Sequence, residues 1–236
     1  VYIYINMSIR FGSVRNIAKH QIFDDDHDVR KDIDLIDGET FIDDIKKDVR
    51  DIVKLMYPKR IDNFHVIEAG LRKINTLIYQ NLMMKKYLMG EKQDGHPQVK
   101  GDFYRHIVEC IEAHIDREDI CSLGFQVIKN LISVKEEKRR ILYRDALINC
   151  NSTRLILDAI RKHIGANSDV CEYGLQALRF FVYSSNSIIS EVKHFGGLEV
   201  CEMCHAEYKV SRPRIKKHAK ALLEQLNSIE DESLYL

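Results

Sequence analysis

Two clusters of cysteine and histidine are the parts of this sequence best suited to metal or haem chemistry. Residues 201–205 read CEMCH, which has the C-x-x-C-H spacing of covalent haem attachment. His106, Cys110 and His114 are spaced four residues apart, so a helix would place all three on one face. Imidazoles and thiolates are common ligands of zinc. The sequence thus offers one candidate haem site and one candidate zinc site.

The CEMCH segment also fits the interior of a helix. Leu198, Cys201 and Cys204 recur at helical spacing and would share the inward face of that helix. A free cysteine behaves as a small buried hydrophobic residue. We therefore expect Cys201 and Cys204 to pack in the core and to bind neither haem nor zinc.

The second cluster has a similar alternative. A straight helix presents a single ion with only about two of the three side chains at this spacing. In the repeat alignment given below, Cys110 corresponds to Ile160 and His106 corresponds to Ile156, both core positions. We expect a structural role for these residues as well, so the sequence predicts no metal site and no cofactor.

No local signature of catalysis accompanies these clusters. The sequence has no Ser-His-Asp set, no Gly-rich phosphate loop and no zinc-protease helix. Lys+Arg and Asp+Glu are both 36, whereas a dedicated nucleic-acid binder usually carries a strong basic excess. We therefore expect a protein that is not an enzyme and that meets charged partners through local patches.

The strongest local patch is basic and lies between residues 212 and 220. Its members are Arg212, Arg214, Lys216, Lys217 and Lys220. Such a cluster can serve as a nuclear-import signal or as a phosphate-binding face. It is more often the solvated side of an amphipathic terminal helix, and we favour that interpretation.

The elements that carry these residues are helices. Only three prolines and eleven glycines interrupt the chain, and apolar residues elsewhere recur at helical spacing. Pro58 ends one such segment, in which one face is apolar: Phe41, Ile45, Val49, Ile52 and Met56. The sequence therefore predicts an all-α fold.

A repeated unit organises these helices. Residues 121–131 read CSLGFQVIKNL and residues 171–181 read CEYGLQALRFF, at an offset of 50 residues. Residues 70–77 (GLRKINTL) and 219–226 (AKALLEQL) follow the same template. The shared positions are a small residue (Gly70, Gly124, Gly174, Ala219), an apolar residue four places later (Ile74, Ile128, Leu178, Leu223) and another seven places later (Leu77, Leu131, Phe181, Leu226). The small residue indicates that another helix passes close by.

Each repeated segment is expected to be the last of three helices in a unit. The expected helices are 135–146, 152–163 and 168–183 in the third unit, and 186–195, 197–208 and 211–228 in the fourth. The turn FGGLE at 195–199 and the small-x-x-x-Leu-x-x-Leu pattern resemble armadillo repeats, with HEAT repeats as a near relative. The resemblance covers about four units over 38–229. It implies a right-handed superhelix in which each unit buries its neighbour's apolar face.

The armadillo resemblance also implies a binding surface. Third helices of armadillo proteins line a concave groove that receives extended peptides or partner helices. The residues two and six places after the small residue would face it here: Arg72 and Thr76, Gln126 and Asn130, Gln176 and Phe180, with Arg179 beside them. Gln and Asn amides can pair with a peptide backbone, and Phe180 can supply an apolar anchor. Import receptors of this superfamily carry Trp and Asn at these places. This chain has no Trp and only Asn130 matches, so classical nuclear-signal recognition is not expected.

These features favour a monomeric scaffold that binds a protein or peptide partner. The alternative is a helical-repeat protein that binds nucleic acid through Arg139, Arg140, Arg161, Arg179 and the cluster from Arg212. Six scattered cysteines and the lack of a secretory leader favour the cytoplasm, with the nucleus as the alternative. The apolar opening at residues 1–7 is too short to cross a membrane.

The expected organisation has three parts. Residues 1–37 form an N-terminal extension, 38–229 form the repeat domain, and 230–236 form an acidic tail. The extension contains an aspartate-rich stretch that lacks the ligand order of an EF-hand, so we expect a solvated arm rather than a calcium loop. Within the repeats, the segment 90–102 is rich in glycine and charge and is expected to be a loop.

Overall fold

The structure is a computed structural model, and it describes residues 38–58, 60–91, 103–208 and 210–228. The acidic extension, most of the expected loop at 90–102 and the acidic tail lie outside the described residues. The chain divides into two compact parts, 1–45 and 46–236. The side chains discussed below all belong to the second part, and the word unit is kept for a three-helix repeat.

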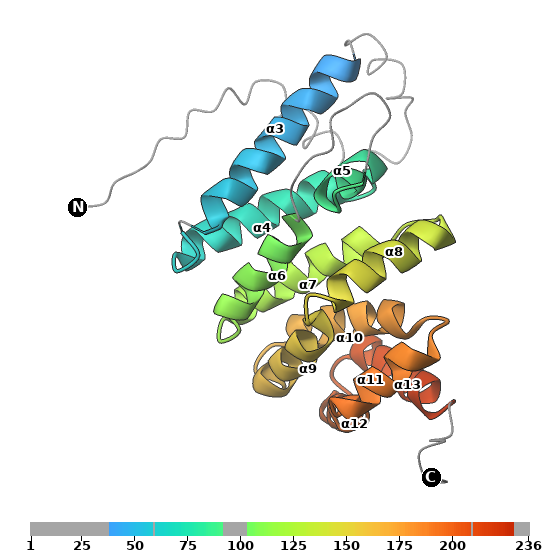
Figure 1. The fold of residues 1–236 in the computed structure, drawn as a ribbon. Coiled ribbons are helices and arrows are strands. Elements are labelled where there is room, and N and C mark those ends of the chain that lie inside the picture. Colours follow the sequence, from blue (N-terminus) through green and yellow to red (C-terminus); the bar gives the residue numbers. More distant parts are fainter. Residues whose placement is uncertain (1–37, 59, 92–102, 209, 229–236) are drawn as a thin grey trace, which may run out of the picture. The chain divides into compact units, whose positions relative to one another are not determined.

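All the regular structure in the described residues is helical, which confirms the predicted all-α fold (Figure 1). No described helix is long and apolar enough to span a membrane. The helices are α3 (Gly38–Met56), α4 (Phe64–Ile78), α5 (Leu82–Leu88), α6 (Phe103–Ala113), α7 (Glu118–Ile132), α8 (Glu137–Ile148), α9 (Ser152–His163), α10 (Ser168–Val182), α11 (Asn186–His194), α12 (Gly197–Glu207) and α13 (Pro213–Asn227).

The helices are grouped in threes, as the repeat predicted. The full units are α5–α7, α8–α10 and α11–α13, while the first unit contributes α3 and α4 among the described residues. The third helices pack in sequence, α4 on α7, α7 on α10 and α10 on α13 (Figure 1). This packing of third helix on third helix is that of an armadillo-type solenoid. The hand of the superhelix stays a prediction.

A close approach between second and third helices explains the repeated small residue. A Cβ atom on Gly70 would lie 2.7 Å from Met56 Cγ of α3, and one on Gly174 would lie 2.8 Å from Ile160 Cδ1 of α9. A Cβ atom on Gly124 would collide with Ile111 of α6. Because the same place is filled from the second helix in three units, glycine is required there by packing rather than by backbone conformation.

This packing corrects the predicted alignment of the second helices. Gly124 contacts Ile111 and Gly174 contacts Ile160, so the second helices are offset by 49 residues, one fewer than the third helices. Cys110 therefore corresponds to Ala159 and not to Ile160. Both are fully buried, so the expected core role of Cys110 is confirmed. The expected equivalence of His106 with Ile156 is wrong, and His106 is half-buried.

The predicted core is confirmed at most of its positions. The residues expected to form one continuous core were Ile74, Leu77, Ile128, Leu131, Leu178, Phe181 and Leu223. Five of these seven are fully buried: Ile74, Ile128, Leu131, Leu178 and Phe181. Leu77 and Leu223 are only half-buried, which contradicts the prediction, and Ile78, Leu222 and Leu226 are buried near them. Both exceptions lie on the first and last third helices, where only one neighbouring third helix is described to cover the apolar face.

The turn between first and second helices requires special backbone geometry. Gly196 has a φ of 79°, in the left-handed region that favours glycine. A Cβ atom on the next residue, Gly197, would lie 2.7 Å from the backbone oxygen of Val192. The third unit has Asn151 at the same place as Gly196, with a φ of 65°. Asparagine is one of the few other residues that adopt this conformation readily.

Buried cations on the first helices bond the ends of the third helices. The Lys85 ammonium donates to the Ser133 carbonyl at 2.7 Å, and Arg144 donates to the Tyr183 carbonyl at 2.9 Å. These carbonyls belong to the C-cap residues of α7 and α10. A positive charge there also interacts favourably with the negative end of the helix dipole. Burial lowers the pKa of Lys85. In the fourth unit the corresponding residue of α11 is Ile189, which is apolar and buried.

The other ends of the third helices are joined across units by aromatic side chains. Each bond runs from the end of a second helix to the backbone before the third helix of the preceding unit. Histidine rings donate to carbonyl oxygens in two cases, and a tyrosine hydroxyl accepts from an N–H in the third. The pairs are His114 with Ile61, His163 with Ile115, and Tyr208 with Gly165.

Candidate functional site

The predicted binding residues lie on the third helices, and their exposure differs from one end of the row to the other. We call the row formed by these residues and their bonded neighbours the third-helix face. Arg72 and Thr76 on α4 are exposed, while four residues of α7 and α10 are half-buried: Gln126, Gln176, Arg179 and Phe180. Asn130 is buried, with 8% of its surface exposed.

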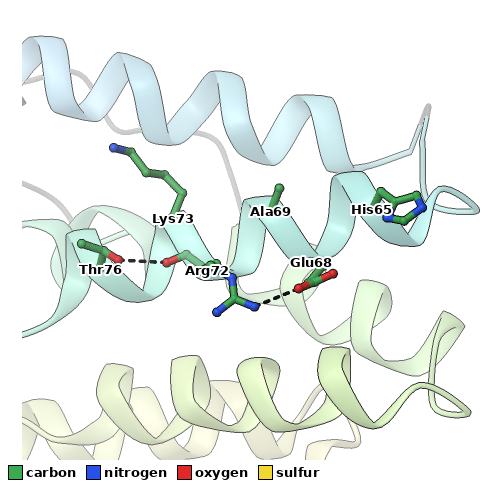
Figure 2. A pocket seen from close by; sticks show the side chains of 6 residues that line it. All are labelled: His65, Glu68, Ala69, Arg72, Lys73 and Thr76. Carbon is green, nitrogen blue, oxygen red and sulfur yellow. Dashed lines mark hydrogen bonds and ion pairs between the residues drawn. The ribbon is translucent and has the colours of Figure 1, made fainter. Parts of the chain in front are cut away.

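On α4 the face forms an open hollow of about 400 Å³. Its lining comes entirely from α4, as Figure 2 shows: His65, Glu68, Ala69, Arg72, Lys73 and Thr76. The Arg72 guanidinium pairs with Glu68 at 2.8 Å, and the Thr76 hydroxyl donates to the Arg72 carbonyl at 3.0 Å. Two of the predicted binding residues therefore border the hollow. The charge of Arg72 is already matched by a carboxylate one turn away.

The contact between α4 and α7 is made by neutral amides. Asn75 donates to Gln126 Oε1 at 3.0 Å, and Asn130 donates to Asn75 Oδ1 at 2.7 Å. We call this set of three residues the amide rung. Asn130 was expected to face the groove and to be at least partly exposed, and this is wrong, because its amide is buried against Asn75 on the neighbouring helix. A buried polar group of this kind is stable only when it is hydrogen-bonded.

The contact between α10 and α13 has a different chemistry. Arg179 Nη1 lies 2.9 Å from His218 Nδ1, and the Gln176 amide lies 3.2 Å from His218 Nε2. Because a guanidinium can only donate, His218 Nδ1 accepts from Arg179, while the Gln176 amide contacts the other ring nitrogen. We call Gln176, Arg179 and His218 the charged rung.

Several cations surround the charged rung. Burial lowers the pKa of His218 to about 4, and the positive charges of Arg179, Lys217, Arg214 and Lys129 contribute to that shift. Lys129 lies 5.6 Å from the centre of the Tyr173 ring. Burial also lowers the pKa of Lys129, although the nearby Glu172 carboxylate opposes that change. The imidazole is therefore neutral at physiological pH and stands inside a positive field.

Three residues of this face were not predicted from the sequence: Asn75, Lys129 and His218. The predicted residues stood two and six places after the small residue, but the contacts between helices also use the fifth place, occupied by Asn75, Lys129 and Arg179. A repeated polar residue at that place was the available signal. His218 was not predicted because it stands at a place that is apolar or aromatic in the other units: Ala69, Leu123 and Tyr173.

The two cysteine and histidine clusters serve as packing and hydrogen-bonding groups. Cys201 and Cys204 are fully buried on α12, which confirms the predicted core position. His106 stacks on Tyr57 with ring centres 4.3 Å apart, and His114 bonds the chain before α4. Within the described ranges, no group of three His, Cys, Asp or Glu residues could hold a metal ion.

Comparisons with known proteins add little to these observations. No protein-family model matches the sequence, and neither does any curated protein. Among solved structures, the chain is similar to an engineered protein at 13% identity and a TM-score of 0.47, over 92% of this chain and 99% of the other. A designed armadillo repeat protein is similar at 13% identity and a TM-score of 0.33, over 75% of this chain and 99% of the other. These scores are too low to carry an argument, so the fold rests on the packing described above.

Proposed function

We propose that this protein is a non-enzymatic scaffold that binds an extended peptide or a partner helix across its third-helix face. The observation that carries the proposal is the row of half-exposed polar and aromatic side chains on successive third helices. Gln126, Gln176 and Phe180 are each only partly covered. Amides that can donate and accept, next to an aromatic ring, suit a peptide backbone with an apolar side chain.

Nucleic-acid binding, the alternative function, has weaker support. Arg139 is bonded to Glu91 at 2.8 Å and Arg161 is paired with Asp158 at 2.9 Å. Arg140 lies over the Tyr183 ring, 4.6 Å from its centre. Three of the guanidinium groups that the alternative requires for phosphate contacts are therefore engaged within the fold. The net charge of zero points the same way.

Site-specific cross-linking tests the proposal. A photoreactive amino acid is placed at Gln176 on α10, and in a matched protein at Arg154 on the exposed side of α9. Both proteins are irradiated in cell extract, and the cross-linked species are identified by mass spectrometry. We expect a protein partner to be captured from position 176 and not from position 154. Capture at equal levels from both positions contradicts the proposal.

Affinity measurements with the captured partner complete the test. The double variant Gln176→Ala with Phe180→Ala removes a half-exposed amide and the aromatic anchor. Loss of a central aromatic contact costs about 2 kcal/mol or more, so we expect affinity to fall at least about thirtyfold. Asn130 is left intact because its removal would test stability instead. An unchanged affinity in a folded double variant moves the site elsewhere.

A further inference from the structure

We infer that the partner of the third-helix face is acidic where it crosses α10 and α13, and that a cation cluster around His218 binds its carboxylates. This inference rests on the proposed function. The cation cluster consists of Lys129 on α7, Arg179 on α10, and Arg214 and Lys217 on α13. Arg179 contacts the His218 ring at 2.9 Å, and the other three act on it through their positive charge.

The charges in this region do not balance. Among the described residues, Glu172 is the carboxylate that pairs with the cluster, at 4.0 Å from Arg214, and it also accepts from Gln176 at 3.2 Å. Within the described residues, Arg179 and Lys217 form no ion pair, and Lys129 has only the nearby Glu172 carboxylate. Elsewhere on the face the charges are matched, because Arg72 pairs with Glu68 and the amide rung is neutral. The positive excess is confined to one end of the row.

Two further features indicate that this region lacks hydrogen-bond acceptors and negative charge. Arg179 Nε is buried and has no hydrogen-bond partner among the described residues. Burial and the neighbouring cations hold His218 neutral, and an anion placed among those cations would remove part of the cause. Arg214 is accessible, with 85% of its side chain exposed. The region therefore combines accessible cations at its rim with an unsatisfied donor beneath them.

An acidic peptide fits these features better than a nucleic acid does. Nucleic acids need basic side chains spaced along an extended phosphate chain. Here the cations are concentrated over α7, α10 and α13, while the α4 end of the same face offers Glu68 and the amides of the amide rung. A peptide with carboxylates at one end and neutral residues at the other would complement both parts.

The direct test uses synthetic peptides and the whole protein. A fluorescent peptide of alternating glutamate and alanine is titrated by anisotropy, against the same peptide with glutamine in place of glutamate. A single-stranded RNA oligonucleotide of similar length is the third probe. We expect the glutamate peptide to bind at least about tenfold more tightly than the glutamine peptide and than the RNA, because charge-assisted hydrogen bonds favour carboxylates.

The variant Arg214→Gln with Lys217→Gln removes two charges of the cluster and should weaken the glutamate peptide by about tenfold. Its matched control is Lys138→Gln with Arg154→Gln, two exposed cations of α8 and α9, which should leave binding unchanged. Thermal unfolding of both variants checks that they are folded.

The outcomes separate this inference from the proposed function. Equal binding of the glutamate and glutamine peptides overturns the inference, and so does tighter binding of RNA or an equal loss in the control variant. If any of these occurs while position 176 still captures a protein partner, the proposed function stands and only the acidic character of the partner is lost. If position 176 captures nothing above the control, the proposed function fails as well.

Discussion

The amide rung and the charged rung both join neighbouring third helices, but they hold different chemistry. Between α4 and α7, two neutral hydrogen bonds join Asn75 to Gln126 and to Asn130. Between α10 and α13, Arg179 and Gln176 contact a neutral His218 in the presence of further cations. Two contacts of the same kind, between successive third helices, thus carry polar side chains of different chemistry.

Polar residues on a helical repeat can therefore serve either the fold or a partner. A buried amide with all its bonds made within the protein contributes to stability, and little of it is left for a ligand. A half-exposed cation without a matching carboxylate contributes little to stability and remains available for binding. The following changes test whether the amide rung contributes to stability while the charged rung remains available for binding.

The largest effect is expected from the core that both rungs share. Leu178→Ala beside the charged rung and Ile128→Ala beside the amide rung each delete fully buried contacts and leave a cavity. Each change should lower the free energy of unfolding by about 2–5 kcal/mol, measured by urea denaturation. A loss below about 0.5 kcal/mol at either position contradicts the assigned register of the third helices.

Removal of a rung amide should separate the two rungs. Asn130→Ala leaves the Asn75 carbonyl oxygen without its donor and should cost about 1–3 kcal/mol of unfolding free energy. Gln176→Ala removes a half-exposed amide and should cost about 0.5 kcal/mol or less. Both are compared in the same denaturation experiment. Equal costs would show that the charged rung is as structural as the amide rung.

His218 of the charged rung should also make the stability of the protein depend on pH. The pKa of His218 is about 4 in the folded protein, below its ordinary value of 6.5, so the unfolded chain takes up a proton first. Stability should therefore fall as the pH drops from 6.5 to about 4, by on the order of 1–2 kcal/mol after allowance for solvent screening. The difference between the wild type and His218→Gln isolates this contribution. A difference that does not change with pH would place His218 in a solvated environment.

The smallest effect is expected from two neighbouring lysines of α13. Lys216→Glu with Lys217→Glu should change the unfolding free energy by less than about 0.5 kcal/mol, because Lys217 is exposed, Lys216 is only half-buried, and charges in contact with solvent contribute little to stability. Thermal unfolding provides the measurement, and the far-ultraviolet spectrum serves as a control. A large drop in melting temperature would show that these side chains are packed. It would contradict the statement that cations near the charged rung contribute little to stability.

The sequence was sufficient to predict the repeat because apolar spacing and small residues are local signals. Gly70, Gly124 and Gly174 recur where a second helix must pass, and their contacts agree with that prediction. Leu77 and Leu223 carry the same local signal but lie at the two ends of the described row. The burial of these two side chains depends on which helices lie next to them. The apolar pattern of a single helix carries no information about its neighbours.

The candidate site was harder to predict because its polar residues depend on distant partners. Asn130 looked available for a ligand, but its partner Asn75 lies 55 residues earlier in the chain. Lys85 and Arg144 belong to charged segments that resemble solvated surface, yet each is buried against a backbone carbonyl. Identical residue types can therefore be exposed or buried, and only the packed structure distinguishes them.

The apolar Ile189 has a consequence for the order in which the chain opens. In a stacked repeat protein each unit is stabilised mainly by its neighbours, so opening begins where neighbours and bonds are fewest. A cation on each of the first helices α5 and α8 donates to the end of α7 and of α10. At the corresponding place α11 has the apolar side chain of Ile189, which cannot donate a hydrogen bond to α13. Amide protons of α13 should therefore exchange with deuterium before those of α7 and α10. Unfolding would then proceed from the last unit toward the middle of the chain.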